Sequence, residues 1–241
     1  MIVQNALMMD ASREPHGWCG NFCARMKHPL PRSVRRRIEI LRSATAAFRR
    51  RGYHGASVDQ IASALNMTKG NLYYYFKNKE EILYVCHDYS LDLVLKQLKE
   101  VERNSWAPDK KLHALISGFV HLFIDVLPGT VWTLDLEALS PPVLKKIIVK
   151  RDRFDRGVRR ILKQGMDSGV FAPGDPKLLT FAIMGAINWI PRWFDPSGMA
   201  KSDEIARSFA NYLVAGLLAS PSGARPRGES VRALGSLPRV R

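Results

Sequence analysis

The sequence predicts an all-α protein, in which a small N-terminal domain of three helices precedes a larger helical domain, with about nine helices in the whole chain. Three observations predict this class. Apolar residues recur every three or four positions, no stretch of residues 32–103 alternates as a strand would, and Pro or Gly separates the helical segments. The 241 residues, 46% of them hydrophobic, suffice to bury a sizeable core. We therefore expect a globular protein made of helices.

Composition divides the chain into four parts. Residues 1–31 hold irregularly placed Gly, Pro, His and Trp, so we expect a flexible segment, in which Met26 leaves open a later start of translation. Residues 32–79 form the small helical domain and residues 80–220 the larger one. Residues 221–241 are rich in Pro, Gly, Ser and Arg, a composition that cannot build a core, and we expect a disordered basic tail.

The positive charge is concentrated in one short region. The formal net charge is +15, and residues 32–79 hold 11 Lys and Arg against 2 acidic residues, whereas residues 80–220 balance 18 against 17. Such a region indicates an acidic partner, either nucleic acid or an anionic membrane surface. Its charges lie among short helices and not on one wide amphipathic helix, which favours nucleic acid over a membrane surface. On nucleic acid, Arg35, Arg36 and Arg37 would reach a minor groove or phosphates.

The first part of the small domain predicts two helices of different length. Apolar side chains from Val34 to Phe48 keep one face, and Gly52 suits a helix C-cap, so the first helix is expected to end there. Ser57 then begins a capping box with Gln60, in which the hydroxyl accepts a hydrogen bond from a backbone N–H and the amide reaches back. This box opens a second helix of about two turns.

A turn and two further helices follow. Asn66 tolerates the left-handed conformation that a tight reversal needs, and Thr68 can cap a third helix that begins at Lys69. Asn78 and Glu81 match a second capping box, which opens a long fourth helix with one apolar face.

Two short helices joined by a tight turn form a helix-turn-helix, whose second helix would enter the major groove of DNA. Leu72 and Phe76 are expected to face the core, with the helix ending at Tyr75 or Phe76. The side chains left to face DNA are those of Thr68, Lys69, Asn71, Tyr73, Tyr74 and Tyr75. A tyrosine hydroxyl can reach a phosphate at low entropic cost, although some of these tyrosines can instead belong to the core or its rim. Lys79 would add a point charge along the same phosphates.

At these residues the chain resembles a known family. The stretch VDQIASALNMTKGNLYYYFKNKEEIL is similar to the DNA-binding region of the TetR family of bacterial transcriptional repressors, and the likeness covers Arg35 to Leu83. The resemblance implies phosphate contacts by Tyr73, Tyr75 and Lys79. It implies helix caps that also touch the DNA backbone at Ser57 and Thr68. It implies base-edge contacts by Lys69, Gly70, Asn71 and Tyr74. Asn66 stands where the family usually has glycine, a departure that the left-handed conformation accommodates.

Four helical segments are predicted in the larger domain, at residues 110–126, 142–167, 176–194 and 202–218. The last two carry faces of small or apolar side chains, namely Ala182, Gly185, Ala186, Phe209, Leu213 and Leu217. By the family resemblance, these two helices pair with their copies as a four-helix bundle in a homodimer, which would place two recognition helices about one DNA turn apart on a palindrome. Ordinary packing within one chain is the alternative.

The larger domain also holds side chains typical of a ligand pocket, which combines large apolar surfaces with a few polar groups. They are His113, His121, Trp132, Asp135, Trp189, Arg192 and Trp193, and each can equally be a core residue. The stretch GAINWIPRWFDPSG resembles TetR-type regulators of fatty-acid and steroid degradation that respond to acyl-CoA thioesters. That resemblance implies a small hydrophobic, acyl-CoA-like effector, whose phosphate Arg192 or the arginines of residues 151–160 would meet, although that run also suits a solvated helix face. Pro191 is expected to kink the helix.

Other classes are less well supported. The chain has no catalytic motif, Gly-rich phosphate loop or metal-spaced cluster, so we expect neither an enzyme, a metal site nor a bound cofactor. Cys19, Cys23 and Cys86 suit reduced thiols in a cytoplasmic protein, and no signal peptide or membrane-spanning run is apparent. Our hypothesis is a TetR-type repressor that binds palindromic operator DNA as a homodimer and is released by a small effector. The alternatives are a DNA-binding regulator without an effector, and an activator.

Overall fold

The computed structural model describes residues 32–126 and 135–219, and Trp132 and the two terminal segments lie outside this range. Within it, the helices are α2 (Arg32–Gly55), α3 (Val58–Ser63), α4 (Lys69–Tyr75), α5 (Lys79–Arg103), α6 (Pro108–His121), α7 (Pro141–Asp167), α8 (Pro176–Trp193) and α9 (Ser202–Ala215). A π-helical turn η1 (Leu122–Val126) continues α6, and a 3-10 turn η2 (Leu136–Ala138) precedes α7. The described residues contain no strand beyond an isolated bridge between Phe171 and Leu218, which confirms the all-α prediction.

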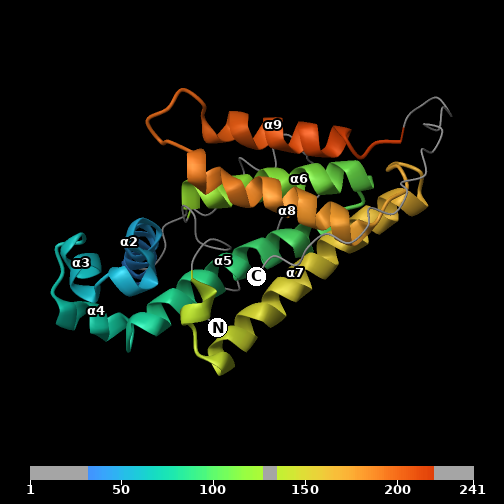
Figure 1. Cartoon of the computed structure of the whole chain (residues 1–241). Coiled ribbons are helices and arrows are strands. Elements are labelled where there is room, and N and C mark those ends of the chain that lie inside the picture. Colours follow the sequence, from blue (N-terminus) through green and yellow to red (C-terminus); the bar gives the residue numbers. More distant parts are fainter. Residues whose placement is uncertain (1–31, 127–134, 220–241) are drawn as a thin grey trace, which may run out of the picture.

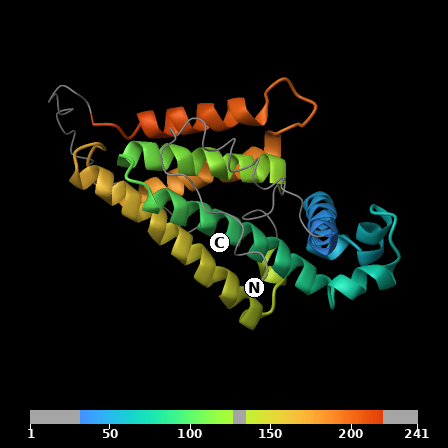
Figure 2. The same ribbon diagram turned by 180° about the vertical axis from the view of Figure 1, so that it is seen from behind.

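The helices form two groups joined by α5. Helix α2 and the short helices α3 and α4 lie together at one end of the molecule, and α5 runs from that end into the larger group (Figure 1). There α5 packs on α7, while α6 packs on α9 (Figure 2). No helix in either described range is long and apolar enough to cross a membrane.

The capping signals of the small domain appear in the structure. The Ser57 hydroxyl accepts a hydrogen bond from Gln60 N at 3.1 Å, and the Gln60 amide oxygen accepts one from Ser57 N at 3.2 Å. Asn66 has a φ of 53°, as expected for the turn. The Thr68 hydroxyl accepts a hydrogen bond from Asn71 N at 3.2 Å, and α4 begins at Lys69. Local sequence therefore sets both helix starts.

One boundary agrees with expectation and one hydrogen bond differs from it. Gly52 has a φ of 67° and a ψ of 169°, so the regular first helix ends there as predicted, and the rest of α2 to Gly55 is a separate short turn beyond this kink. At the start of α5, the Asn78 side chain accepts from Glu81 N at 2.8 Å, as predicted. The Glu81 carboxylate, however, accepts from Lys77 N and not from Asn78 N, one residue earlier than a capping box requires.

Close packing fixes α5 between its neighbours. Gln97 is buried and donates to the carbonyl of Ala114 on α6 at 2.9 Å. On α7, a Cβ added at Gly157 would lie 2.2 Å from a methyl carbon of Leu98, so only glycine allows this approach. The helix that leaves the small domain is thus held by the larger one over much of its length.

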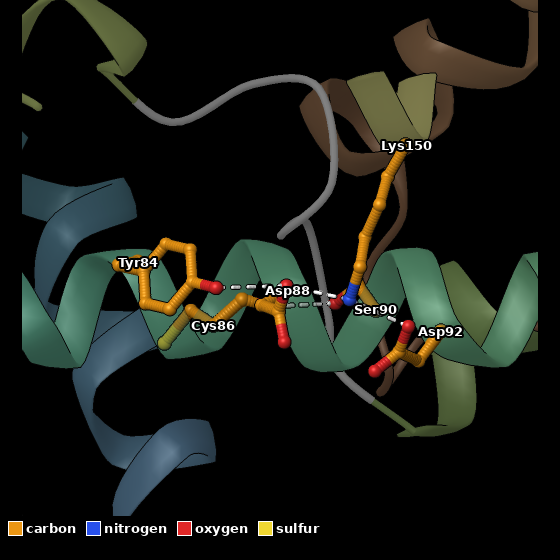
Figure 3. A network of polar contacts seen from close by, with 6 residues as sticks. All are labelled: Tyr84, Cys86, Asp88, Ser90, Asp92 and Lys150. Carbon is orange, nitrogen blue, oxygen red and sulfur yellow. Dashed lines mark hydrogen bonds and ion pairs between the residues drawn. The ribbon is translucent and has the colours of Figure 1, made fainter. Parts of the chain in front are cut away.

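A polar cluster between α5 and the first half of α7 adds to this hold. The Lys150 ammonium lies 2.6 Å from carboxylate oxygens of both Asp88 and Asp92 on α5, and the Tyr84 hydroxyl donates to Asp88 at 3.2 Å (Figure 3). Partial burial lowers the pKa of Lys150, but the hydrogen bonds and charges of the two aspartates outweigh it and raise that pKa. The cluster therefore keeps a cation between two anions that would otherwise repel each other.

Helix α8 includes Pro191 and ends at Trp193, one residue before the predicted end. Its start matches the sequence signal, because the Asp175 side chain accepts from Lys177 N at 2.7 Å and Pro176 opens the helix.

Candidate nucleic-acid interface

Helix α4 has one face in the core and one in solvent. Leu72 and Phe76 are buried, and the Arg37 guanidinium lies 4.9 Å from the ring centroid of Phe76. Tyr74 is 85% exposed and Tyr73 is 41% exposed. The inward and outward faces are thus the ones that the sequence predicted, and α4 has an aromatic, hydroxyl-bearing surface available to a partner.

The remaining α4 residues differ in how much of their surface is exposed to a partner. Lys69, Gly70 and Asn71 are exposed at its N-terminus, whereas Tyr75 is half-buried and its ring lies 5.3 Å from that of Tyr74 in an edge-on arrangement. An edge-on pair stabilises both rings. Tyr75 therefore lies at the rim and can orient Tyr74 as well as reach a phosphate.

A lysine of α4 is already paired within the domain. The Lys69 ammonium lies 2.9 Å from a carboxylate oxygen of Asp59 on α3. The hydrogen bond and charge of Asp59 raise the pKa of Lys69 above its ordinary value. Asp59 was not among the residues that sequence reasoning selected, because its partner lies ten positions later and across the turn.

Arg36 is used mainly inside the domain. Its guanidinium donates to Glu39 at 2.7 Å and to the carbonyl of Leu65 at 3.0 Å, and so joins α2 to the end of the α3 segment. Arg35 is exposed on the neighbouring turn. Of these two predicted DNA contacts, Arg35 presents more surface to a partner.

Two open hollows lie on this domain. One, of about 310 Å³, is bounded by α2, the turn and α4 and is lined by Arg36, Asn66, Met67, Asn71, Tyr74 and Tyr75. The other, of about 280 Å³, lies between α2 and α3 and is lined by Ser43, Ala47, Arg50, Arg51, Gln60, Ser63 and Ala64. Arg50 and Arg51 line the second hollow, which contains none of the residues predicted to contact DNA.

Lys79 lies at the point where α2 meets α5. Its ammonium donates to the carbonyl of His54 at 3.3 Å and lies 4.4 Å from the ring centroid of Tyr53. A cation over an aromatic face is attracted by the electrons of the ring. Lys79 therefore binds within the domain in the free protein, and its charge remains beside the first turn of α5.

Hydrogen bonds tie the small domain to the larger one. Tyr53 N donates to the Asp135 carboxylate at 2.7 Å, and the Arg42 guanidinium donates to the carbonyl of Val126, the last residue of η1, at 2.8 Å. Asp135, which the sequence analysis assigned to a ligand pocket, is thus exposed at this junction.

Beside this junction, a bond within the larger domain joins the start of α5 to the start of α7. Ser140 N donates to the Glu80 carboxylate at 2.7 Å. The hydrogen bonds from the hydroxyl and the N–H of Ser140 hold the pKa of Glu80 below its ordinary value. Glu80 is therefore charged at neutral pH and accepts a charge-assisted bond.

The two predicted pocket histidines join α6 to α9. His113 Nε2 lies 3.0 Å from the side-chain oxygen of Asn211. His121 is buried, with Nδ1 at 2.9 Å from Asp125 and Nε2 at 3.3 Å from Asp203. Both therefore reach towards the outer helix α9.

The predicted pocket residues of α8 lie on its surface. Trp189 is 62% exposed, Trp193 stacks on Phe209 of α9 with 6.1 Å between ring centroids, and the Arg192 guanidinium lies 5.8 Å from the centroid of the Trp189 ring. They share α8 with Ala182 and Gly185, which are also exposed. Residues predicted to line a ligand pocket and residues predicted to form the dimer interface therefore lie on the same exposed helix.

This surface is larger than the sequence suggested. Leu178, Phe181 and Tyr212 are also exposed large side chains of α8 and α9. Among the other predicted dimer residues, Ala186, Phe209 and Leu213 are partly exposed and Leu217 is buried. We call the side chains of Leu178, Phe181, Ala182, Gly185, Trp189 and Tyr212 the α8–α9 face.

The described residues bear on three other kinds of chemistry, namely a metal site, a reactive thiol and an anion-binding run of arginines. No group of His, Cys, Asp and Glu in them is arranged to hold a metal ion. Burial raises the pKa of the Cys86 thiol to about 12, so this cysteine is unreactive at neutral pH. In the arginine run of α7, Arg160 lies 2.6 Å from Glu102 and Arg159 pairs with Asp155, while Arg153 and Arg156 are exposed.

Comparison with known proteins agrees with this geometry. Residues 40–84 match the family model described as bacterial regulatory proteins, tetR family, and residues 105–217 match a tetracyclin repressor-like C-terminal domain. The crystal structure of the TetR family regulator PfmR from Thermus thermophilus has 31% identity and a TM-score of 0.65, over 73% of this chain and 97% of that one.

Two further similar proteins have informative descriptions. AibR, in complex with isovaleryl coenzyme A and operator DNA, has 28% identity and a TM-score of 0.60, over 74% of this chain and 98% of that one. The HTH-type transcriptional repressor KstR2 of Mycolicibacterium smegmatis is 24% identical over 189 residues, 77% of this chain and 92% of KstR2. With its helix-turn-helix at one end and its helical C-terminal domain, the chain belongs to the TetR family of bacterial transcriptional regulators.

Proposed function

We propose that this protein is a ligand-responsive repressor that binds a palindromic operator as a homodimer through α4. The observation that carries the proposal is the exposed, hydroxyl-bearing surface of α4, with Tyr73 and Tyr74 outward and Leu72 fixed in the core. A helix held in this way presents a rigid surface to the major groove. The 11 basic residues of the small domain supply the general attraction to DNA.

The contacts divide into positioning and reading. Tyr73, Tyr75 and Lys79 are proposed to bind phosphates, together with the two capping hydroxyls of Ser57 and Thr68. Lys69, Gly70, Asn71 and Tyr74 are proposed to face base edges, because they are the exposed residues at the start and middle of α4. Arg35 is proposed to reach a neighbouring phosphate or minor groove, with Arg36 fixing the turn beside it.

The α8–α9 face is proposed as the dimer interface. Exposed apolar surface of this extent costs free energy in water, and a second copy would cover it. Two copies of this face can pack against each other, because the small side chains of Ala182 and Gly185 leave room for the rings of Phe181 and Trp189 of a second copy. Two copies joined here would carry two α4 helices to one duplex.

The effector is proposed to be a small hydrophobic molecule of the acyl-CoA class, bound in the larger domain. The support is the coenzyme A thioester bound by the similar protein AibR. Exposed Arg192 and the α7 arginines Arg153 and Arg156 would be available to its phosphates.

The junction offers a route from effector to DNA. Arg42 holds the end of η1, Asp135 holds the last turn of α2, and Glu80 holds the start of α7. An effector that binds better when η1 and α7 are displaced would change these bonds and, through α5, the separation of the two α4 helices. Only such a difference in affinity between two states can release DNA.

The test begins with selection of duplexes from a random pool by the purified full chain. Fluorescence anisotropy then follows the selected duplex during titration with acyl-CoA thioesters of increasing chain length, with free coenzyme A and the free acids as controls. We expect a thioester to release the duplex and the controls not to. If the protein selects a sequence that nothing releases, the effector is overturned and the regulator without an effector remains; if it selects none, the whole proposal is overturned.

A further inference from the structure

The small domain contains carboxylates at only two places in residues 32–79, and both are paired. Glu39 pairs with Arg36, which also bonds the Leu65 carbonyl and so supports the fold of the turn. Asp59 pairs with Lys69 at 2.9 Å, and no buried group depends on that contact, because the side chains are 60% and 50% exposed. An exposed ion pair of this kind adds little to stability. The Asp59 carboxylate, favoured in the first turn of α3, therefore remains accessible to a partner besides Lys69.

Its position is at the surface proposed to meet DNA. Asp59 lies in the first turn of α3, and Lys69 is the first residue of α4. A cation at a helix N-terminus is disfavoured by the helix dipole, whereas an anion there is favoured. Asp59 therefore compensates Lys69 at the N-terminus of the reading helix and limits the directions in which its ammonium points.

The pair offers a donor and an acceptor side by side. An ammonium has three N–H donors, so the bond to Asp59 leaves two for a further partner. The carboxylate keeps unused lone pairs that can accept a hydrogen bond. In the major groove, a G·C pair presents two acceptors on guanine and the amino donor of cytosine, the pattern that complements such a pair.

The same carboxylate works against binding elsewhere. Every duplex presents phosphates, and a negative charge on the reading surface is repelled by all of them. At a site where no amino donor meets Asp59, this repulsion is uncompensated, which is how specificity arises from a penalty on wrong partners.

From the proposed function, on which this step rests, we infer that Asp59 is a specificity-determining residue. It orients Lys69 towards the guanine of one G·C pair in each half-site, accepts from the cytosine of that pair, and weakens binding to duplexes that lack it.

The test compares Asp59→Asn with Glu39→Gln, which removes the other carboxylate of the domain and serves as the matched control. Each variant is used for selection from a random pool and for anisotropy with the wild-type duplex and a scrambled duplex over a salt series. Thermal unfolding verifies that each variant folds.

For Asp59→Asn we expect tighter binding to the scrambled duplex, by several-fold, and about tenfold loss of discrimination, since a wrong base pair ordinarily costs a factor of this order. The selected sequences should show a weaker preference for one G·C pair per half-site, because the amide keeps an acceptor but lacks the charge that holds Lys69 and repels other duplexes. Lys69→Gln should lose the same pair, and adding Asp59→Asn to it should remove no further preference. Glu39→Gln should leave the selected sequence unchanged.

The inference is overturned if Asp59→Asn selects the same sequence as the wild type and changes both affinities by one common factor. That result would leave the proposed function standing, because the wild type still selects an operator. A wild type that selects no sequence would overturn the proposed function and this inference with it.

Discussion

In the DNA-binding domain, side chains within three positions of each other cap the short helices, whereas in the larger domain ion pairs join helices that are far apart in the chain. Ser57 caps with Gln60, and Thr68 with Asn71. By contrast, Lys150 of α7 reaches Asp88 of α5, 62 positions away. Local sequence therefore sets where the short helices begin, and contacts between distant residues set how the helices of the larger domain are placed.

The largest expected effect concerns the α8–α9 face. As the proposed dimer interface, this face lets the larger domain control DNA binding without touching DNA. Trp189→Glu should separate the dimer and weaken operator binding by about 100-fold, because two linked contacts become one. Sedimentation and anisotropy measure the two effects. Val149→Glu changes an exposed apolar residue of α7 in the same way and should have neither effect. A Trp189→Glu protein that stays dimeric would show that the interface lies elsewhere.

Two glycines differ in how closely their helices are packed, Gly157 on α7 and Gly185 on α8. Gly157→Ala should lower the free energy of unfolding by about 1–3 kcal/mol, because the new methyl overlaps Leu98. Gly185→Ala meets no atom within 4 Å in the single chain. Gly185→Ala should not lower the free energy of unfolding of the monomer at low protein concentration, but it should weaken the dimer. Denaturant unfolding at low and high protein concentration distinguishes these outcomes, and equal behaviour of the two variants would contradict the packing described.

A smaller effect is expected at the junction. Asp135→Ala removes the acceptor of Tyr53 N and should cost about 0.5–1.5 kcal/mol locally. Hydrogen exchange of the Tyr53 amide should become faster while core amides remain unchanged. Asp195→Ala removes an exposed aspartate that bonds only Ser197 in its own loop and is the control. Unchanged exchange at Tyr53 would show that Asp135 does not hold the domain.

The smallest effect is a pH dependence. The pKa of Glu80 is lowered in the folded protein by Ser140, so the carboxylate favours folding above its ordinary pKa of 4.5, and this contribution is lost as the pH falls through the folded value. The thermal midpoint should fall more steeply below about pH 4.5 for the wild type than for Glu80→Gln. Parallel curves for the two proteins would contradict a role of this charge at the junction.

The sequence could predict what neighbouring residues decide. The caps at Ser57 and Thr68, the left-handed Asn66 and the inward Leu72 each follow from a few adjacent side chains. Helix bounds in the larger domain also followed from periodicity, apart from the π-helical end of α6 and the end of α9, which stops at Ala215 and not at residue 218.

Residue roles in the larger domain could not be predicted in the same way. Asp135 was expected in a pocket because it lies near apolar residues in the chain, but its partner Tyr53 is 82 positions away. Trp189 was expected inside because tryptophan is large and apolar, yet α8 turns it outwards. Such placements depend on how helices pack, which no local pattern records.

The most direct test of the account is competition between the selected duplex and a scrambled duplex, measured over a salt series for the wild type and Tyr74→Ala. The account predicts that the wild type prefers the selected duplex by about 10³-fold or more. Tyr74→Ala should lose much of this preference and keep the same salt dependence, because it removes a reading contact and no charge. Equal binding of the wild type to both duplexes would contradict the claim that α4 reads DNA.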